Sequence, residues 1–576
     1  MSYQGFISRL SQEEHDFYEI KNAAAEFYRV NRVPEEIERA LNELFFHTPE
    51  DLHGYLANYF TKLSAPPRIS RVKGREVYDA KGQLTVEAEV FCIICNKEQS
   101  MSSASISSHF GPKETSLQSK ERGDHVMTAV QWINQPLNNL LKDQNPCDQS
   151  KVDLILSDFF MACYLEEKNL QNREREESRS PESDVVLPSP PPAQTKDKKG
   201  VDKGKKSNTA EKPFHPPEPA EPVLLGSLAI GSVSLALART GAQIQGIPLY
   251  KYIAALQNQE APTRFHIPLS LVTLLSCGKT SPGKLSLLEE VILIPKVGQR
   301  IKQVLHSSAA LCIITMTLEL QKEMMRIMNT STKSGAAQAV LCDRGAPAVS
   351  YERPEQPLDL IAEACSNLGL ALGTEIHLAL NCAAPELMDY SKGKYEIATG
   401  VLKSPDELVD MYQALISKYP AVVALIDPFR REDTNQWEKL SNVIGDSCSL
   451  LSDITYKPQA PPLPGVRGHI LKHMNETTVS DLIRITSEQQ GAVLIGTTCN
   501  EPCSDESLSD MAVGLGLDYV KLGGLSGAER MTKYNQLISI EEELAQQGML
   551  VSKEKHPPPL FPEEPQEQSP AAGRTA

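Results

Sequence analysis

The sequence predicts an α/β protein whose C-terminal half is a closed eight-stranded barrel. Short apolar runs, mostly separated by helical stretches, end near eight positions: Leu274, Ile294, Asn381, Ile426, Ser452, Lys472, Gly496 and Lys521. Eight such runs in one span favour a closed barrel over an open doubly wound sheet. Earlier in the chain, residues 84–92 alternate between apolar and polar side chains, which is typical of a half-buried strand.

Composition narrows the class of protein. The 576 residues carry a net charge of −16, which argues against non-specific binding to nucleic acid or to an anionic membrane. The first twenty residues lack the apolar core of a signal peptide, and no apolar run is long enough to span a membrane. The twelve cysteines are scattered, without the paired spacing of a zinc site. A cytoplasmic protein is therefore expected.

Two segments are predicted to be disordered. Residues 168–222 are charged, rich in proline and poor in large apolar side chains, and residues 551–576 have a similar composition. Such segments cannot bury enough apolar surface to offset the entropy lost on ordering. The first interrupts the ordered part of the chain as an insertion, and the second forms a tail.

Residues 12–63 are predicted to be helical. In "HTPEDLHGYLANYFTKL", Thr48 is expected to cap a helix that begins at Pro49. The helix carries one apolar stripe formed by Leu52, Tyr55, Leu56, Tyr59, Phe60 and Leu63. This stripe either packs on the body of the protein or forms a dimerisation module. Residues 33–63 resemble the dimerisation and docking helices of protein kinase A regulatory subunits.

The stretch "VKLGGLSGAERMTKYNQLISIEEEL" reads as a strand, a turn and a helix. Lys521 ends the strand, and Gly523 and Gly524 allow close backbone approach in the turn. Lys472 ends an earlier strand in "GHILKHMNE". Because reactive side chains gather at the carboxyl ends of barrel strands, both lysines are expected at one mouth. A lysine there can hold an anion or act as a base.

The same stretch closely resembles the C-terminal signature of enolases. "REVYDAKGQLTVEAEVF", "GSVSLALARTGAQIQGIPLYKYIA", "EEVILIP", "ALIDPF" and "HILKHMN" resemble further enolase segments in the same order. The resemblance covers most of residues 69–165 and 223–548. It implies an α+β N-terminal capping domain before the barrel. The implied division is a helical extension at 1–65, the capping domain at 69–165 and 223–260, the insertion at 168–222, the barrel at 263–548 and the tail at 551–576.

The resemblance also implies an activity, the dehydration of 2-phospho-D-glycerate to phosphoenolpyruvate with Mg²⁺ as cofactor. Lys472 matches the base that removes the proton next to the carboxylate, and Lys521 matches the substrate lysine. Glu290 matches the substrate-side glutamate, with Glu289 as the alternative. The His-Arg-Ser cluster that grips the substrate in the family falls on Thr498, Cys499 and Asn500.

The remaining positions depart from the enolase pattern. The three metal carboxylates fall on Asn381, Ile426 and Ser452, so the metal site retains at best Asp453 with Asn381. The proton-donor glutamate falls on Arg344. Isoleucine cannot bind a cation, and Mg²⁺ prefers charged oxygens. Two functions therefore remain open: a weak enolase-type lyase, and a non-catalytic scaffold whose mouth, made more cationic by the lost carboxylates, binds small anions.

Further expectations rest on the resemblance alone. Enolases form homodimers, so a homodimer is expected here. The chain resembles a divergent enolase-like branch found in sperm, where glycolytic proteins are fixed along the flagellum. A role in sperm motility, with anchoring to a partner through the amphipathic helices at 33–63, follows as a hypothesis.

Overall fold

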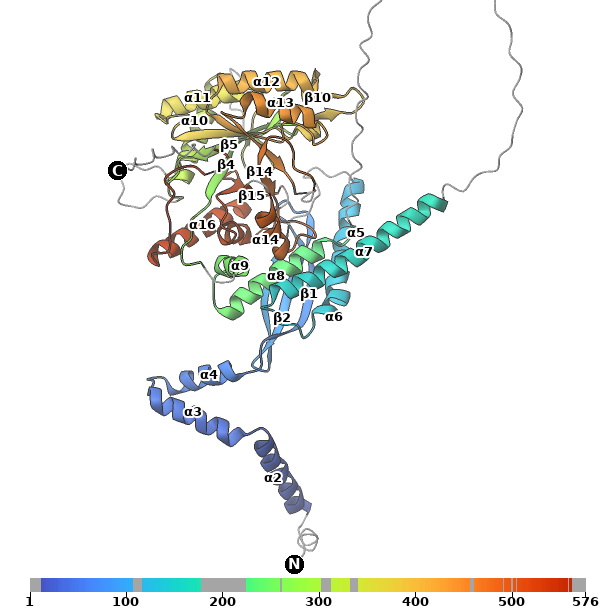
Figure 1. Cartoon of the computed structure of the whole chain (residues 1–576), viewed down its shortest axis with the longest axis vertical. Helices are drawn as coiled ribbons and strands as arrows, with labels where there is room; N and C mark the ends of the chain where they lie inside the picture. The colour runs from blue at the N-terminus through green and yellow to red at the C-terminus, as the bar shows by residue number, and fades with distance from the viewer. Residues whose placement is uncertain are drawn as a thin grey trace, which may run out of the picture. The chain divides into compact units, whose positions relative to one another are not determined.

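A computed structural model gives the fold of the chain (Figure 1). It describes residues 12–106, 116–177, 224–258, 262–301, 312–331, 340–455, 460–489, 492–498, 501–503, 505–557 and 559–561. The chain divides into two compact units: Met1–Arg68 with Cys92–Gln99, and Ile69–Phe91 with Ser100–Ala576.

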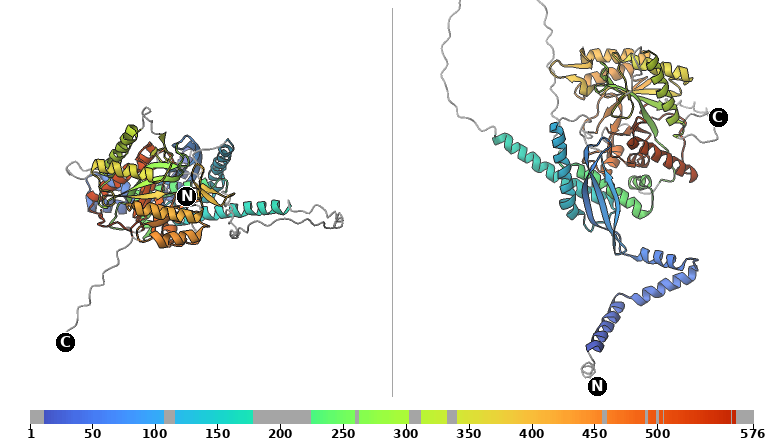
Figure 2. Two further views of the ribbon diagram at one scale, coloured as in Figure 1. Left: turned by 90° about the horizontal axis from the view of Figure 1, so that it is seen from above. Right: turned by 180° about the vertical axis from the view of Figure 1, so that it is seen from behind.

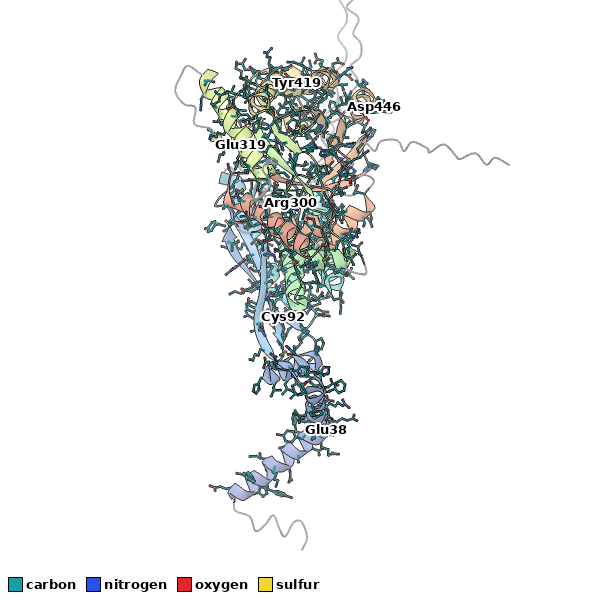
Figure 3. The ribbon with its side chains drawn as sticks, turned by 90° about the vertical axis from the view of Figure 1, so that its left-hand side faces the viewer. Glu38, Cys92, Arg300, Glu319, Tyr419 and Asp446 are labelled. Atoms are coloured by element: carbon teal, nitrogen blue, oxygen red, sulfur yellow. The ribbon has the colours of Figure 1, made fainter. Side chains whose placement is uncertain are left out.

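The first unit contains the predicted N-terminal helices, α2 (Gln12–Val30), α3 (Val33–His47) and α4 (Leu52–Leu63). Glu35 and Glu36 occupy the first turn of α3, where negative charge interacts favourably with the helix dipole. Many large apolar side chains of these helices are exposed, including those of Phe17, Ile20, Phe27, Ile37, Leu41, Phe45, Phe46, Leu52 and Leu63. Figure 3 shows the side chains of α3, among them Glu38, projecting from the helix.

The predicted cap of α4 is wrong by one turn. Thr48 instead ends α3, with a left-handed backbone (φ 39°) and its N–H bonded to the carbonyl of Leu44. Asp51 caps α4, because its carboxylate accepts a 2.9 Å hydrogen bond from the Gly54 N–H. The helix dipole also favours a negatively charged side chain at this position, and a threonine hydroxyl carries no charge.

A three-stranded sheet follows, and most of its residues belong to the second unit. Its strands neighbour one another in the order β1 (Arg68–Tyr78), β2 (Leu84–Ile94) and β3 (Lys97–Ser105). The predicted alternation in β2 is confirmed, since Val86, Ala88 and Val90 are buried. The helices that follow are α5 (Ser116–Trp132), the π-helix η1 (Ile133–Leu137), α6 (Asn138–Leu141), α7 (Gln149–Glu177), α8 (Leu228–Gln245) and α9 (Leu249–Gln257).

Helix α7 corrects the predicted start of the disordered insertion. The helix continues through Lys168 to Glu177 and extends beyond the rest of the unit (Figure 2). Its first turns are fixed by a buried network in which the Ser234 hydroxyl of α8 donates a 2.7 Å hydrogen bond to Asp153. Residues 178–223, the remainder of the predicted insertion, lie outside the described part of the chain.

The predicted closed barrel of eight strands is confirmed. Its strands are β4 (Leu269–Gly278), β5 (Leu287–Pro295), β8 (Ile376–Asn381), β12 (Val422–Ile426), β13 (Ser449–Asp453), β14 (Val466–Leu471), β15 (Ala492–Gly496) and β16 (Tyr519–Gly523). They neighbour one another in this order, and β16 pairs with β4 to close the ring.

One strand runs against the others. Strand β5 is antiparallel to both β4 and β8, whereas the remaining neighbours in the ring are parallel. A short connection from β4 to β5 produces a hairpin rather than a crossover. The reversed direction places Glu290, near the start of β5, opposite Asn381 at the end of β8. Glu290 therefore reaches the end of the barrel where the parallel strands finish.

Helices and small strands surround the barrel (Figure 1). The helices are α10 (Ile313–Ser331), which carries Glu319 (Figure 3), α11 (Glu355–Leu368), the 3₁₀ helix η2 (Ala384–Leu387), α12 (Pro405–Lys418), α13 (Thr434–Ile444), α14 (Val479–Glu488), α15 (Ser507–Gly514) and α16 (Ala528–Gln546). The small strands are β6 (Val340–Leu341), β7 (Pro347–Ala348), β9 (Met388–Asp389), β10 (Lys394–Ala398) and β11 (Val401–Lys403). Within the described ranges, no helix is both long and apolar enough to cross a membrane.

The C-terminal segment corrects the predicted start of the tail. The Val551 N–H donates a 2.7 Å hydrogen bond to the carbonyl of Phe265. Leu560 is buried in the apolar cluster inside the barrel, and the Tyr519 hydroxyl donates a 2.7 Å hydrogen bond to the carbonyl of Pro557. Ordered packing therefore continues to Phe561, because a few apolar residues in this proline-rich segment find a ready-made apolar surface on the barrel.

Candidate active site at the barrel mouth

The two lysines predicted for the mouth lie at the same end of the barrel. Lys472 directly follows β14, Lys521 lies in β16, and β15 runs between them. The register pairs Leu471 with Ile495 and Gly496 with Lys521. Both lysines therefore stand at one level of the barrel, which we call the mouth.

Glu290 joins Lys521 to three other parts of the barrel. Its Oε1 atom lies 2.6 Å from Lys521 Nζ and 3.1 Å from Arg344 Nη1, and it accepts a 2.8 Å hydrogen bond from Asn381 Nδ2. Its Oε2 atom accepts a 2.6 Å hydrogen bond from the Thr273 hydroxyl. Burial opposes ionisation, but Arg344 and Lys521 together hold the pKa of Glu290 well below its usual range. Glu290 is thus a fixed anion.

Arg344 reaches the mouth on a tightly held loop. The Gly524 N–H donates a 2.7 Å hydrogen bond to the Arg344 carbonyl, and Arg530 Nη2 donates a 2.6 Å bond to the Asp343 carbonyl. A Cβ atom on Gly524 would lie 2.2 Å from the Gly345 carbonyl oxygen. The predicted close approach at Gly524 is confirmed, and it is the loop carrying Arg344 that approaches.

Glu289 also faces Arg344, but more loosely. Its Oε1 atom lies 3.7 Å from Arg344 Nε, and its side chain is 19% exposed, whereas that of Glu290 is fully buried. Burial raises the pKa of Glu289 to about 6, against the opposing charge of Arg344. Of the two adjacent glutamates, Glu290 is the one bound to Lys521.

Lys472 forms a second ion pair in the mouth. Its Nζ atom lies 2.5 Å from Asp453 Oδ2, and Asp453 Oδ1 accepts a 3.0 Å hydrogen bond from the Thr455 N–H. The Asp453 N–H in turn donates to Asp427 Oδ1 at 3.0 Å. Burial and the neighbouring Asp453 charge raise the pKa of Asp427 to about 7. The pair favours the ammonium form of Lys472, which cannot accept a proton.

The positive charge expected at the mouth is paired with carboxylates of the chain itself. Lys472 faces Asp453, while Lys521 and Arg344 share Glu290, with Glu289 nearby. Each cation of the mouth has a carboxylate partner within the chain. The cause is β5, whose reversed direction brings two glutamates to an end of the barrel where a parallel strand would have placed Pro295.

Comparisons with known proteins agree with this geometry. The model of the family described as "Enolase, C-terminal TIM barrel domain" matches residues 264–557. A zebrafish (Danio rerio) protein named Enolase 4 is 46% identical over 98% of this chain and 98% of its own length. Its namesakes from Xenopus laevis and Homo sapiens are 43% and 42% identical, covering 97% and 94% of this chain and 98% and 91% of their own lengths. The chain belongs to the enolase family. Members of the enolase family generally use Mg²⁺, bind phosphoglycerate-like substrates and are typically dimeric.

The donors of this enolase mouth do not fit Mg²⁺. The amide oxygen of Asn381 accepts a 3.2 Å hydrogen bond from the Ala383 N–H, and the amide nitrogen is bound to Glu290. Ile426, which pairs with Asn381, is buried and has no ligand atom. Asp453 is bound to Lys472. In the described residues, no group of three His, Cys, Asp or Glu side chains could hold a metal ion.

The predicted substrate cluster is only partly placed. Thr498 is buried, and its hydroxyl has no hydrogen-bond partner among the described atoms. Cys499 and Asn500 lie outside the described residues. The next residue, Glu501, is buried and lies 2.5 Å from Lys533 Nζ and 3.3 Å from Arg530 Nε.

Sequence reasoning missed several groups of this enolase site. Asp427 carried a usable signal, since it directly follows a barrel strand in "ALIDPF". Thr273 carried none, because a threonine within an apolar strand is commonplace. Arg344 was singled out, but its two carboxylate partners depend on contacts between segments far apart in the sequence.

Proposed function

We propose that this chain is an enolase-type lyase that dehydrates 2-phospho-D-glycerate to phosphoenolpyruvate in glycolysis, with a low turnover. The observation that carries the proposal is the placement of Lys472 and Lys521 at one level of the same mouth. Membership of the enolase family supports the same substrate class.

In the proposed reaction, the neutral amine of Lys472 takes the proton from the carbon next to the substrate carboxylate. Lys521 and Arg344 attract the anionic groups of the substrate. The electron pair of the broken C–H bond forms the new double bond, and the hydroxyl of the neighbouring carbon leaves as hydroxide, which takes a proton from solvent. Two features make the reaction slow. Asp453 stabilises the ammonium form of Lys472, and the family's metal carboxylates are replaced. If about 6–8 kcal/mol of oxyanion stabilisation were lost, the rate would fall by about 10⁴–10⁶.

A second candidate is a non-catalytic scaffold that binds small anions. The observation that favours it is the commitment of the mouth's polar groups to one another: Asn381 to Glu290, and Asp453 to Lys472. In this function the lysines bind an anion but transfer no proton.

The test is phosphoenolpyruvate formation from 2-phosphoglycerate by the purified full chain, at several Mg²⁺ concentrations, with Lys472→Ala alongside. The control is Lys284→Ala, which removes an exposed lysine paired with Glu352. Turnover that Lys472→Ala abolishes and Lys284→Ala preserves supports the lyase. Absent turnover, or turnover equal in all three proteins and hence due to contaminating enolase, leaves the scaffold.

We propose that the helices at 33–63 anchor the protein to a partner, in the cytoplasm and along the sperm flagellum. Support comes from the apolar groove of about 510 Å³ lined by Tyr28, Val33, Pro34, Ile37, Glu38, Leu41 and Asn42. The body, through the capping domain and the barrel, is proposed to form the homodimer typical of the family. A chain lacking residues 1–65 should remain dimeric by light scattering and lose its position in sperm. Unchanged localisation would refute the anchor, and a monomeric truncated chain would refute dimerisation through the body alone.

A further inference from the structure

The positive charge that could hold an anion in this mouth is supplied by side chains of the protein. Arg344 stands where the family carries a proton-donating glutamate, and its guanidinium reaches both Glu289 and Glu290. The side chains at the family's metal positions offer no free charged oxygen, since Asn381 binds Glu290, Asp453 binds Lys472 and Ile426 is apolar. Any anion entering the mouth must therefore be held by fixed cations.

The two carboxylates around Arg344 differ in how firmly they are held. Glu290 is fully buried and is bound by Lys521, Asn381 and Thr273 as well as by Arg344. Glu289 lies 0.6 Å farther from the guanidinium, at 3.7 Å against 3.1 Å, and is partly exposed. An incoming anion can displace Glu289 at a lower cost than Glu290, because Glu289 is partly exposed, whereas displacing Glu290 would leave a fully buried charge unpaired.

The backbone of the loop that carries Arg344 is held in place without a ligand. It is fixed to the turn after β16 by hydrogen bonds from the Gly524 N–H to the Arg344 carbonyl (2.7 Å) and from the Ser526 N–H to the Gly345 carbonyl (3.0 Å). A guanidinium offers two parallel N–H donors to a carboxylate or a phosphate. The backbone thus fixes where the Arg344 side chain begins, and its guanidinium has the geometry to bind an anion.

We propose that Arg344 is the resident cation of the mouth and binds the carboxylate or phosphate of a small ligand in exchange for Glu289, without a divalent metal. The inference rests on the proposed function in one respect, that the ligand is a small anion entering this mouth. It adds the residue that receives the anion, the residue that yields to it, and independence from Mg²⁺.

The experiment is calorimetric titration of the full chain with 2-phosphoglycerate, in buffer with a chelator and in buffer with Mg²⁺. We expect equal affinities in the two buffers. Arg344→Gln should weaken binding by about thirtyfold or more. Glu289→Gln should tighten it by about fivefold, because a competing negative charge is removed. Arg326→Gln, which removes an exposed arginine paired with Glu323, is the matched control and should leave binding unchanged.

Arg344→Lys guards against a folding defect. It keeps the charge near Glu290 and should retain metal-independent binding with a smaller loss than Arg344→Gln, and thermal unfolding of both variants shows that they are folded. Binding that requires Mg²⁺ would overturn the inference and leave the proposed function standing. Weaker or unchanged binding by Glu289→Gln would also overturn it. No binding in either buffer would refute the proposed ligand class and this inference together.

Discussion

Lys521 Nζ lies 2.6 Å from Glu290 Oε1, and their side chains are only 3% and 0% exposed. A buried ion pair is costly to leave incomplete, because the remaining charge has no solvent to compensate it. Here one carboxylate compensates two cations, since Arg344 shares the same oxygen atom. The stability of the mouth therefore depends on the side chain of Glu290.

Replacing that side chain gives the first prediction. Glu290→Gln should lower the free energy of unfolding by about 3–5 kcal/mol, because Lys521 and Arg344 lose their shared partner. Chemical denaturation measures the change. Glu352→Gln is the control: it removes an exposed glutamate paired with Lys284, and should cost less than about 1 kcal/mol. Equal losses in the two variants would contradict the central role of Glu290.

A second prediction concerns the turn that holds the arginine loop. In Gly524→Ala the added Cβ would meet the Gly345 carbonyl 2.2 Å away, so the loop must move. We expect a loss of about 1–3 kcal/mol in stability, as for other overpacked sites, together with weaker binding of 2-phosphoglycerate. Gly123→Ala is the control. Gly123 lies in α5, and no atom from elsewhere in the chain lies within 4 Å of the added methyl group, so this variant should weaken neither binding nor stability. Undisturbed binding by Gly524→Ala would show that Arg344 does not depend on this turn.

The docked C-terminal segment should respond to pH. Burial, and then the neighbouring His377, lower the pKa of His556 to about 4. In an undocked segment the His556 imidazole takes up a proton near pH 6.5, whereas in the docked segment it does so only near pH 4. Docking is therefore complete above about pH 6.5 and weakens as the pH falls. The protection of the amides of residues 553–556, measured as exchange relative to the rate of an unstructured peptide at the same pH, should fall between pH 7 and pH 5. In His556→Phe, which still stacks on Phe561, this loss of protection should be much smaller; an identical pH response would assign it to other groups.

The last prediction tests the cap found at α4. Asp51→Ala should cost about 0.5–2 kcal/mol of local stability, because the Gly54 N–H loses its acceptor. Amide exchange in the first turn of α4 should accelerate accordingly, while Asp51→Asn, which keeps an acceptor oxygen, should be close to the original protein. If Thr48→Ala accelerated exchange there more than Asp51→Ala, the cap would be misassigned.

Much of the fold could be predicted from the sequence, because apolar runs and the turn residues between them are local signals. The eight runs became the eight strands, and the alternation in β2 became its buried face. The direction of β5 could not be predicted, because the apolar residues of a strand form the same pattern whether the strand is parallel or antiparallel to its neighbours. Its reversal brings Glu289 and Glu290 to the mouth together, where both face Arg344.

The site was predicted as a set of residues but not as a set of contacts. Lys472, Lys521, Glu290 and Asp453 were singled out, and the structure pairs them two by two. Which cation meets which carboxylate depends on distances between strands, which no local pattern encodes. The ordered segment up to Phe561 was missed for a similar reason: proline-rich composition predicts disorder unless a distant surface receives the chain.

The Lys521–Glu290 pair also affects how the protein is made. The two residues are separated by 231 positions in the chain. At the usual rates of synthesis, about 5–20 residues per second, Glu290 leaves the ribosome roughly 10–50 seconds before its lysine exists. Until then the network around Glu290 lacks its lysine, and the ring of strands cannot close, because β16 lies between β15 and β4. Completion of the barrel is therefore a late event after translation of β16, and a product truncated before Lys521 should be recognised by the cell as unfolded.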